Sequence, residues 1–364
     1  MSLLEIRNLR SVFRARGEEA RAVDGVDLTL ERGEAVGLVG ESGSGKTALA
    51  LSILGLLPHG SGRILPGSSI RLRGEEMVGM KEKRLRQIRG GDVAMVFQEP
   101  MTSLNPVFTV GDQVLEAVRA HRAMDGREGR AEVIRLLREV GIPEPEERAG
   151  AYPHQLSGGM RQRAMIAIAL AGDPSLLIAD EPTSALDVTV QAQILELLER
   201  LQSRFHMALL LISHDVGVVS RVCQTMMVLY AGKVVEEGPT HDLLRSPCHP
   251  YTRGLLGSRL FLKDRRRVLR PIPGEVPEAN AWPEGCRFHP RCSEAWHLCG
   301  REEPRLVAMG LGEGVEIRQG DPRIPGSPGA SPPETDSGGP GGGSRSRTGR
   351  VRCWLFSGDR GEER

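Results

Sequence analysis

The sequence predicts an α/β fold for residues 1–240, and three observations carry this prediction. Short apolar runs typical of buried parallel strands occur at Val93–Phe97, Leu176–Ala179 and Ala208–Ile212. Stretches with apolar residues three and four positions apart, which indicate amphipathic helices, lie between these runs. A glycine-rich turn also joins a predicted strand at Glu34–Val39 to a predicted helix.

The remaining elements of this region follow in chain order. Alternating apolar and polar residues predict strands over Leu3–Leu9 and Ala22–Leu30. A helix is predicted over Lys46–Leu57, directly after the glycine-rich turn. Helical spacing dominates from Val110 to Val140, where it predicts a helical subdomain inserted between the early and late strands. Thr189–Leu201 carries its apolar residues on one helical face and is predicted to be a further helix.

The composition changes after this region. Residues 241–320 contain many Pro, Arg and Cys residues and predict a small irregular extension. Residues 321–348 consist largely of Gly, Pro and Ser, which predicts a disordered linker. Residues 349–364 form the last segment, in which Val351–Phe356 has a strand-like pattern. The expected organisation is one large domain followed by these three segments.

Composition argues against several classes of protein. The chain of 364 residues has 48 Lys and Arg against 47 Asp and Glu, so its net charge of +1 gives no electrostatic reason to expect nucleic acid as a partner. Aromatic residues make up 4%, which disfavours proteins that stack bases on aromatic side chains. No basic segment followed by an apolar run opens the chain, so we expect no secretory signal. The longest apolar runs fall far short of the roughly 18 residues that a membrane span needs.

A phosphate-binding loop is predicted between a strand and a helix. Gly40-Glu41-Ser42-Gly43-Ser44-Gly45-Lys46-Thr47 fits the pattern G-x-x-x-x-G-K-[ST]. The glycines allow successive backbone N–H groups to point at phosphate oxygens. Lys46 is expected to hold the β- and γ-phosphates, and the hydroxyl of Thr47 is expected to bind Mg²⁺. The strand–turn–helix context favours a nucleoside triphosphate site over a glycine-rich turn without a ligand.

Two further segments carry chemistry that suits such a site. Asp180 and Glu181 end an apolar strand, where Asp180 could reach Mg²⁺ and Glu181 could polarise an attacking water. Taken alone, two acids after a strand are more often a solvated loop. The segment Leu156–Arg163 places Ser157 and two glycines, Gly158 and Gly159, at the start of an apolar helix, an arrangement that suits an anion. Without the phosphate loop, a capped helix and nothing more would explain this segment better.

In this order, the segments resemble the ATP-binding subunits of ABC transporters over residues 1–240. The matching motifs are Walker A at Gly40–Thr47, the Q-loop at Gln98, the signature at Leu156–Gln162, Walker B at Leu176–Glu181, the D-loop at Ser184–Asp187 and the switch histidine at His214. Phe13 lies where this family places an aromatic residue against adenine, although an ordinary core Phe is the alternative. The resemblance implies a P-loop NTPase nucleotide-binding domain with a RecA-like core, an antiparallel β subdomain and a helical subdomain.

The resemblance also implies a role for each motif in an ATPase that uses ATP and Mg²⁺. Thr47, Gln98 and Asp180 would surround Mg²⁺, and Glu181 would be the general base for water. His214 would contact the γ-phosphate. Gln98 would also link Mg²⁺ and water to the surface that meets the membrane subunits.

Two such domains associate head to tail in this family. Ser157, Gly158 and Gly159 would therefore serve the nucleotide held by the partner subunit rather than the one held by Lys46.

The amino-acid sequences of several shorter segments resemble the dipeptide/oligopeptide permease branch of the family. The segments that carry this likeness are Tyr152–Leu156, Ala185–Ile194, Tyr230–Gly238, Ser246–Arg253, Pro271–Gly274 and Gly285–Cys292. The implied partners are a second, related ATPase subunit, two membrane permease subunits and an extracytoplasmic substrate-binding protein, with this chain on the cytoplasmic face of the inner membrane. Permeases for nickel, glutathione and some sugars share these sequence segments, so these solutes remain alternatives to peptides as the cargo. A soluble ABC ATPase without a transporter is a further alternative.

Four cysteines in the last quarter of the chain form a candidate metal site. Cys286, Cys292 and Cys299 have the spacing C-x5-C-x6-C, and Cys353 follows the linker. In one of the two ATPase types of this branch, such a set resembles the ligands of a [4Fe–4S] cluster. Four thiolates also suit zinc, with His289 and His297 as alternative ligands. Free or small-core cysteines without metal are the third interpretation.

Overall fold

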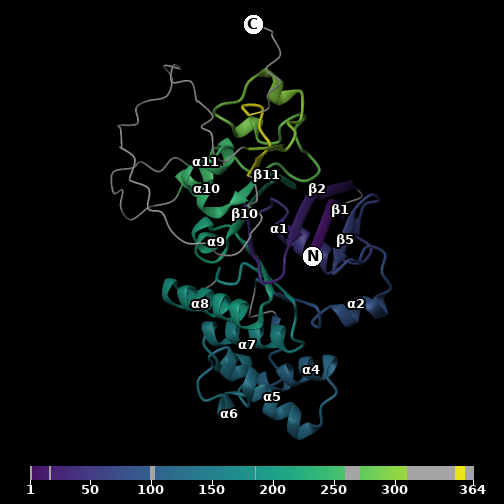
Figure 1. Cartoon of the computed structure of the whole chain (residues 1–364), viewed down its shortest axis with the longest axis vertical. Coiled ribbons are helices and arrows are strands. Elements are labelled where there is room, and N and C mark those ends of the chain that lie inside the picture. The colour runs from purple at the N-terminus through teal and green to yellow at the C-terminus, as the bar shows by residue number, and fades with distance from the viewer. Residues whose placement is uncertain are drawn as a thin grey trace, which may run out of the picture.

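A mixed eight-stranded sheet runs through the centre of the computed structural model, which describes residues 2–15, 18–98, 103–184, 186–258, 271–309 and 349–356 (Figure 1). Its strands are β3 (Ala35–Val39), β7 (Val93–Val96), β8 (Leu176–Asp180), β9 (Ala208–Ser213), β10 (Thr225–Tyr230), β11 (Lys233–Pro239), β12 (Val307–Ala308) and β13 (Arg350–Val351). The order across the sheet is β12-β13-β11-β10-β3-β9-β8-β7. Strands β10, β3, β9, β8 and β7 are parallel, so their carboxyl ends share one edge of the sheet.

A second, antiparallel sheet contains β1 and β2, which are consecutive in the sequence and adjacent in the sheet. Its strands are β1 (Leu4–Ala15), β2 (Glu18–Leu30), β4 (Gly62–Ile64), β5 (Ser69–Leu72) and β6 (Glu75–Glu76). Helix α1 (Lys46–Ile53) contacts β1 and β2 of this sheet and β8 of the central sheet. The phosphate loop at the start of α1 is therefore placed between the two sheets.

The other helices fall into three groups (Figure 1). Helix α2 (Glu82–Ile88) lies beside the antiparallel sheet, and α4 (Val110–His121), α5 (Gly126–Glu139), α6 (Pro145–Arg148) and α7 (Gly158–Leu170) form the helical end of the molecule. The last group comprises α8 (Val188–Phe205), α9 (Val216–Val222), α10 (Thr240–Arg245) and α11 (Pro250–Gly257). Single 3-10 turns occur at Pro153–Gln155, His289–Arg291 and His297–Gly300. The cysteine-bearing extension lies at the end of the molecule opposite α4 and α5.

Two hydrophobic cores lie on the opposite faces of the central sheet. Along β3, Val36 and Leu38 pack into the core shared with the antiparallel sheet and α1, whereas Ala35 and Val39 pack into the core beneath the helices. All five β3 positions are buried, as expected for a parallel strand covered on both faces. Burial on both faces of the sheet therefore explains why the parallel strands are continuous apolar runs in the sequence.

The predicted α/β class is confirmed, together with every strand and helix predicted in residues 1–240, but some boundaries differ. The helical region Val110–Val140 is two helices, because Asp125 caps a new helix and forms a capping box with Glu128. Helix α1 ends at Ile53 rather than Leu57, since the chain turns at Gly55, which has a φ of +60°.

The C-terminal segments depart from the expected layout in one respect. The strand predicted at Val351–Phe356 is only Arg350–Val351, and it pairs with β11, so the last segment extends the central sheet. The predicted linker at 321–348 lies outside the described residues, and the division of the chain at residue 240 stays a prediction. No helix in the described ranges is long and apolar enough to cross a membrane.

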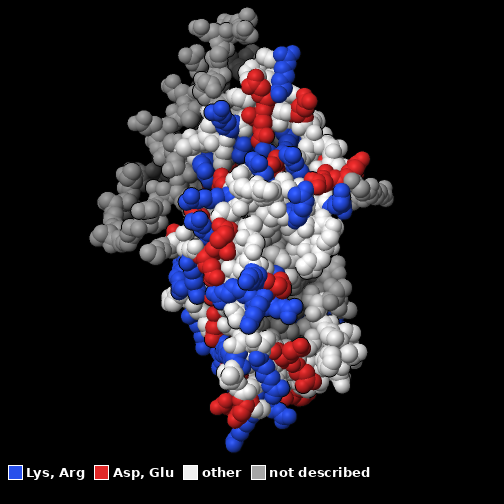
Figure 2. Space-filling view, turned by 90° about the vertical axis from the view of Figure 1, so that its right-hand side faces the viewer, with Lys and Arg blue, Asp and Glu red and all other residues white. Residues whose placement is uncertain are grey.

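Charged side chains of both signs cover the molecule. Figure 2 shows Lys and Arg interspersed with Asp and Glu along the whole length of one face, from the helical end to the extension. This distribution agrees with the balanced composition of 48 basic and 47 acidic residues.

Candidate functional site

The phosphate loop joins the buried strand β3 to helix α1, and two of its glycines are required by space. Gly45 has a φ of +105°, and a Cβ atom there would lie 2.2 Å from the carbonyl oxygen of Ala22. A Cβ atom on Gly40 would lie 2.3 Å from the carbonyl oxygen of Leu229. Backbone therefore packs against backbone on both sides of the loop, which leaves no room for larger residues.

Lys46 is the first residue of α1 and is only 5% exposed. Its Nζ atom donates to the carbonyl oxygens of Gly40 at 2.7 Å and Glu41 at 2.8 Å. Burial lowers the pKa of Lys46, and the nearby carboxylates of Glu181, Asp180 and Glu41 oppose this shift. The ammonium group thus rests on the loop's own carbonyls, where phosphate oxygens would compete for it.

Asp180 ends β8 and has the properties of a cation ligand. Its side chain is 2% exposed, and its Oδ1 atom accepts no hydrogen bond from any described residue. Burial raises the pKa of Asp180, while a hydrogen bond with the side chain of Thr47 lowers it. A buried carboxylate oxygen without a partner is unfavourable unless a cation or donor is added, so Asp180 and Thr47 fit the Mg²⁺ site predicted from the sequence.

Glu181 brings together the three predicted catalytic residues. Gln98 donates a hydrogen bond from Nε2 to Glu181 Oε2 at 3.3 Å, and Nδ1 of His214 lies 3.1 Å from the same oxygen. Gln98 follows β7 and His214 follows β9, so the shared edge of parallel strands places them beside Glu181. Glu181 also has a φ of +45°, a backbone conformation that is uncommon for a residue with a side chain and that recurs at functional sites.

The signature residues lie apart from this group. Ser157 is the N-cap of α7, and its side chain accepts the N–H of Met160 at 3.3 Å, as the sequence predicts. Helix α7 packs on α4, α5, α8 and β7, whereas α1 packs on β1, β2 and β8. Ser157 and Gly158 are exposed, and Gly159 lies against Val190 of α8. Within one chain, these residues present a solvent-facing helix start rather than a second side of the phosphate loop.

Phe13 lies on β1 and is partly buried, with its side chain packed against the core shared by the two sheets. It pairs across the sheet with Ala20 and Gly62. The predicted contact with adenine stays a prediction.

Two residues of the extension reach the phosphate loop, and neither had a role that could be predicted from the sequence. The hydroxyl of Tyr251 accepts the backbone N–H of Glu41 at 2.9 Å, and Arg291 donates to the carboxylate of Glu41 at 3.0 Å. Tyr251 belongs to the His-Pro-Tyr segment, which is visible in the sequence. Arg291 stands between His289 and Cys292 in a segment that was notable only for its cysteines.

The four clustered cysteines line one small cavity in the extension. Cys286, Cys292, Cys299 and Cys353 share this cavity with residues that include Phe288. Burial raises the pKa of Cys292 to about 11 and that of Cys353 to about 12, so both thiols are protonated at neutral pH without a metal. As they stand, no three His, Cys, Asp or Glu side chains among the described residues are arranged to hold a metal ion.

Comparisons with known proteins agree with this geometry. The ABC transporter family profile matches residues 23–184, and the profile described as "Oligopeptide/dipeptide transporter, C-terminal region" matches residues 235–299. A protein of Brucella ovis with the provisional name peptide import ATP-binding protein is 51% identical over 318 residues, covering 84% of this chain and 94% of its own length. A Brucella abortus protein of the same name is 50% identical over 308 residues, covering 85% and 92%.

Solved structures give the same result for the fold. A dimeric ATP-binding cassette in a post-hydrolysis state, bound to ADP and Pi, is 28% identical with a TM-score of 0.58. The match covers 65% of this chain and 98% of that cassette.

Proposed function

Because the chain belongs to the ABC transporter family, with the C-terminal region of oligopeptide and dipeptide transporters, we propose that it is the ATP-hydrolysing subunit of a peptide importer. The convergence of Gln98 and His214 on Glu181, beside a phosphate loop that ends in Lys46, carries this proposal. The names of the curated relatives favour peptides as the cargo.

Glu181 is the proposed general base. Its carboxylate follows β8 directly after Asp180, where it can accept a proton from a water that attacks the γ-phosphate. His214 is proposed to contact the γ-phosphate, and Gln98 to sense the nucleotide for the membrane subunits. Both residues contact Glu181 Oε2, and with nucleotide bound they would exchange these contacts for water and phosphate.

Mg²⁺ is the proposed cofactor, held by Asp180, Thr47 and Gln98. The unpartnered Oδ1 of Asp180 supports this assignment. When bound, the cation would neutralise charge on the β- and γ-phosphates. Asp180 would then be ionised, since the favourable interaction with a cation outweighs the effect of burial on its pKa.

Assembly is proposed to complete the site. Ser157 and Gly158 are exposed and Gly159 is partly exposed at the start of α7, and all three would meet the nucleotide of a second ATPase subunit, proposed to be related but different. Two membrane permeases and an extracytoplasmic substrate-binding protein are the further proposed partners. This arrangement puts the chain on the cytoplasmic face of the inner membrane as a peripheral subunit.

The test is reconstitution of the full chain with its permeases and second ATPase in lipid vesicles. We expect ATP hydrolysis that rises when the binding protein is loaded with a dipeptide or oligopeptide, and uptake of that peptide. Lys46→Ala in this chain is the control and should show neither. Stimulation by nickel or glutathione and not by peptides would show that the cargo is that solute, while the assignment as an importer ATPase would stand. Hydrolysis without any vesicle transport would favour a soluble ABC ATPase.

A [4Fe–4S] cluster at Cys286, Cys292, Cys299 and Cys353 is proposed as a second cofactor. The shared cavity supports it, because the four thiols face one space although Cys353 lies beyond the predicted linker. A single zinc ion is the alternative, and it needs thiolates about 2.3 Å from one centre, which the described side chains do not provide as they stand. A bound cluster would tie together an extension that has few apolar residues.

A further inference from the structure

Glu41, the second residue of the phosphate loop, is held at three separate points. Its backbone N–H donates to the hydroxyl of Tyr251 at 2.9 Å, and its carbonyl oxygen accepts from Nζ of Lys46 at 2.8 Å. Its carboxylate Oε2 accepts from Nη2 of Arg291 at 3.0 Å. Tyr251 and Arg291 belong to the C-terminal extension, 210 and 250 residues further along the chain.

The start of α11 fixes the hydroxyl of Tyr251. His249 is the N-cap of this helix, and its Nδ1 accepts the N–H of Tyr251 at 3.1 Å. Burial lowers the pKa of His249 to about 3, so the ring is neutral and Nδ1 is an acceptor. Glu236 accepts the backbone N–H of His249 at 3.0 Å. The buried ring of Tyr251 packs 4.6 Å from that of Tyr230 and 5.3 Å from that of Phe288.

Arg291 is held just as closely and is only 8% exposed. Its Nε atom donates to the carbonyl of Pro273 at 2.7 Å, and Nη2 donates to the carbonyl of Gly274 at 3.1 Å as well as to Glu41. Its Nη1 atom donates to the hydroxyl of Tyr230 at 3.4 Å. A planar guanidinium with several fixed acceptors has little freedom, so it presents Nη2 to Glu41 in one direction.

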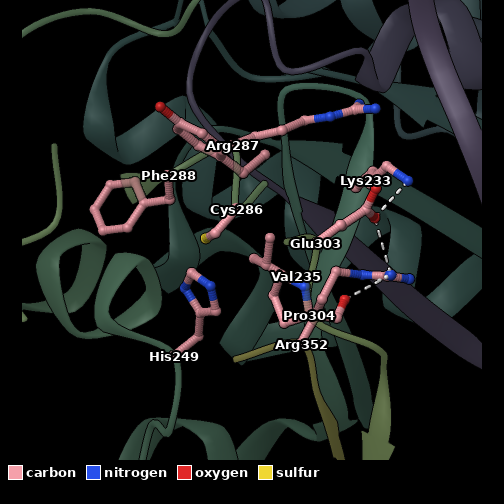
Figure 3. A pocket seen from close by; sticks show the side chains of 10 residues that line it. Lys233, Val235, His249, Cys286, Arg287, Phe288, Glu303, Pro304 and Arg352 are labelled. Carbon is pink, nitrogen blue, oxygen red and sulfur yellow. Dashed lines mark hydrogen bonds and ion pairs between the residues drawn. The ribbon is translucent and has the colours of Figure 1, made fainter. Parts of the chain in front are cut away.

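The extension is also anchored to the central sheet beside this contact. Figure 3 shows Glu303 joined to Lys233 and Arg352 on one side of a pocket, with Phe288 and His249 on the other side. The Lys233–Glu303 and Arg352–Glu303 ion pairs measure 2.5 Å and 3.2 Å. The ion pair of Glu303 with Lys233 of β11 and the packing of Phe288 on Tyr230 of β10 thus hold the extension against the central sheet on both sides of the pocket.

Nucleotide binding would change one of these contacts on Glu41, the one with Lys46. Lys46 gives its ammonium group to the carbonyls of Gly40 and Glu41, and phosphate oxygens form stronger, charge-assisted hydrogen bonds with the same group. When Lys46 turns to a phosphate, Tyr251 and Arg291 still hold Glu41, together with the backbone N–H of Ser44, which donates to the carbonyl oxygen of Glu41 at 3.2 Å.

We propose that Tyr251 and Arg291 are positioning residues for the phosphate loop, acting through Glu41, so that the C-terminal extension sets the affinity of the loop for ATP. The inference rests on the proposed function of Gly40–Thr47 as an ATP phosphate site. Such a loop binds phosphate with successive backbone N–H groups, whose directions depend on the turn that passes through Glu41. A loop held in place before ATP arrives loses less conformational freedom on binding.

The experiment measures binding of Mg²⁺-ATP to the full chain by calorimetry. Tyr251→Phe removes one hydroxyl and keeps the ring in the aromatic cluster, and Arg291→Gln removes the charge that faces Glu41. Each is expected to weaken ATP binding about three- to tenfold, the size of one lost hydrogen bond. Arg253→Gln is the matched control, because it removes an exposed ion pair with Glu294 from the same helix and does not touch the loop. This control should bind ATP like the wild type.

A double-mutant cycle separates positioning from a general loosening of the extension. If Arg291 acts through the carboxylate of Glu41, Arg291→Gln in a Glu41→Gln background should add almost nothing to either single change. Arg291→Lys keeps the positive charge and should recover most of the affinity. Additive losses, with no recovery in the Lys variant, would contradict the proposal.

Failure of the proposed function is distinguishable from failure of this inference. Wild-type chain that does not bind ATP, or Lys46→Ala that binds it normally, would remove the phosphate site and the inference with it. Normal binding by the wild type, loss in Lys46→Ala and unchanged binding in Tyr251→Phe, Arg291→Gln and Glu41→Gln would overturn the inference alone. Glu41→Gln removes the same Arg291–Glu41 ion pair by a change in the loop rather than in the extension. The test therefore remains possible even if Arg291→Gln does not fold.

Discussion

Nδ1 of His214 lies 3.1 Å from Oε2 of Glu181. A carboxylate accepts hydrogen bonds and does not donate them, so His214 carries its proton on Nδ1 when the two groups interact. Gln98 donates to the same oxygen. The carboxylate of the proposed general base therefore contacts both residues that are proposed to sense the phosphate.

Glu181→Gln should abolish ATP hydrolysis and leave ATP binding intact. A glutamine side chain offers an oxygen to Gln98 and His214 in the same place, but it has no basicity toward water. General bases contribute about 10²–10⁴-fold, so hydrolysis by the assembled complex should fall at least about a hundredfold. Phosphate release and ATP binding, measured side by side, check this. A variant that hydrolyses ATP at close to the wild-type rate excludes Glu181 as the base.

His249→Asn should make the free energy of unfolding less dependent on pH in the acidic range. The pKa of His249 is lowered by burial to about 3 in the folded chain, from 6.5, so only the unfolded chain binds its proton between these values. Stability from this residue is present above pH 6.5 and is lost as the pH falls. Asparagine can accept the N–H of Tyr251 as an N-cap and does not titrate.

Urea unfolding at pH 6.5 and 5.5 measures the effect of His249. The wild type should lose about 1 kcal/mol more unfolding free energy than the Asn variant between these pH values. The nearby carboxyl of Glu236, whose pKa is raised by burial, contributes with the opposite sign in both proteins and cancels in the comparison. Parallel pH profiles would show that His249 is not the titrating group.

Ser157→Asn should separate ATP binding from hydrolysis by the assembled pair. Asparagine is as good an N-cap as serine, so α7 should stay folded, but its larger side chain would crowd a nucleotide held by the second subunit. The isolated chain is expected to bind ATP within about twofold of the wild type. Hydrolysis by the pair should fall at least twofold, because one of two sites is blocked. Weaker ATP binding in the isolated variant would place Ser157 beside its own chain's nucleotide instead.

Protein purified without oxygen should be brown and contain about four irons per chain if the four cysteines hold a cluster. Cys292→Ser should bleach it and loosen the extension. Because the pKa of Cys292 is raised to about 11, metal must displace protons from the thiols, so the cluster should be lost more readily as the pH falls. Iron analysis and visible absorbance check this.

Two other results would contradict the assignment of a [4Fe–4S] cluster. Colourless protein with one zinc per chain would indicate a structural zinc ion. Protein with neither metal, and an extension equally ordered in Cys292→Ser, would leave the cysteines as small-core residues.

Much of the fold could be predicted because local pattern and burial agree in residues 1–240. Leu176–Ala179 and Ala208–Ile212 are continuous apolar runs because both faces of the central sheet are covered. The break between α4 and α5 could have been found as well, since Asp125 and Glu128 have the spacing of a capping box. Gln98 and His214 were assigned from the resemblance to the ABC transporter family, and the shared edge of the parallel strands explains why they lie beside Glu181.

The contacts of Glu41 could not be predicted in the same way. Tyr251 and Arg291 lie 210 and 250 residues from it, and no periodicity links positions so far apart. The His-Pro-Tyr segment resembled a family motif, but that likeness did not say which atom the Tyr hydroxyl would meet. The packing of Tyr230, Tyr251 and Phe288 is one of the long-range contacts that bring the extension to the loop.

The pairing of β13 with β11 has a consequence for biosynthesis. On the ribosome, the residues of β11 emerge long before Arg350 and Val351, so this strand presents an open edge to solvent until they arrive. During that interval the charge of Glu237, which pairs with Arg350 in the finished protein, opposes pairing with a foreign strand. A protease that cuts the chain between residues 309 and 349 would leave the finished protein dependent on non-covalent pairing to keep this edge covered.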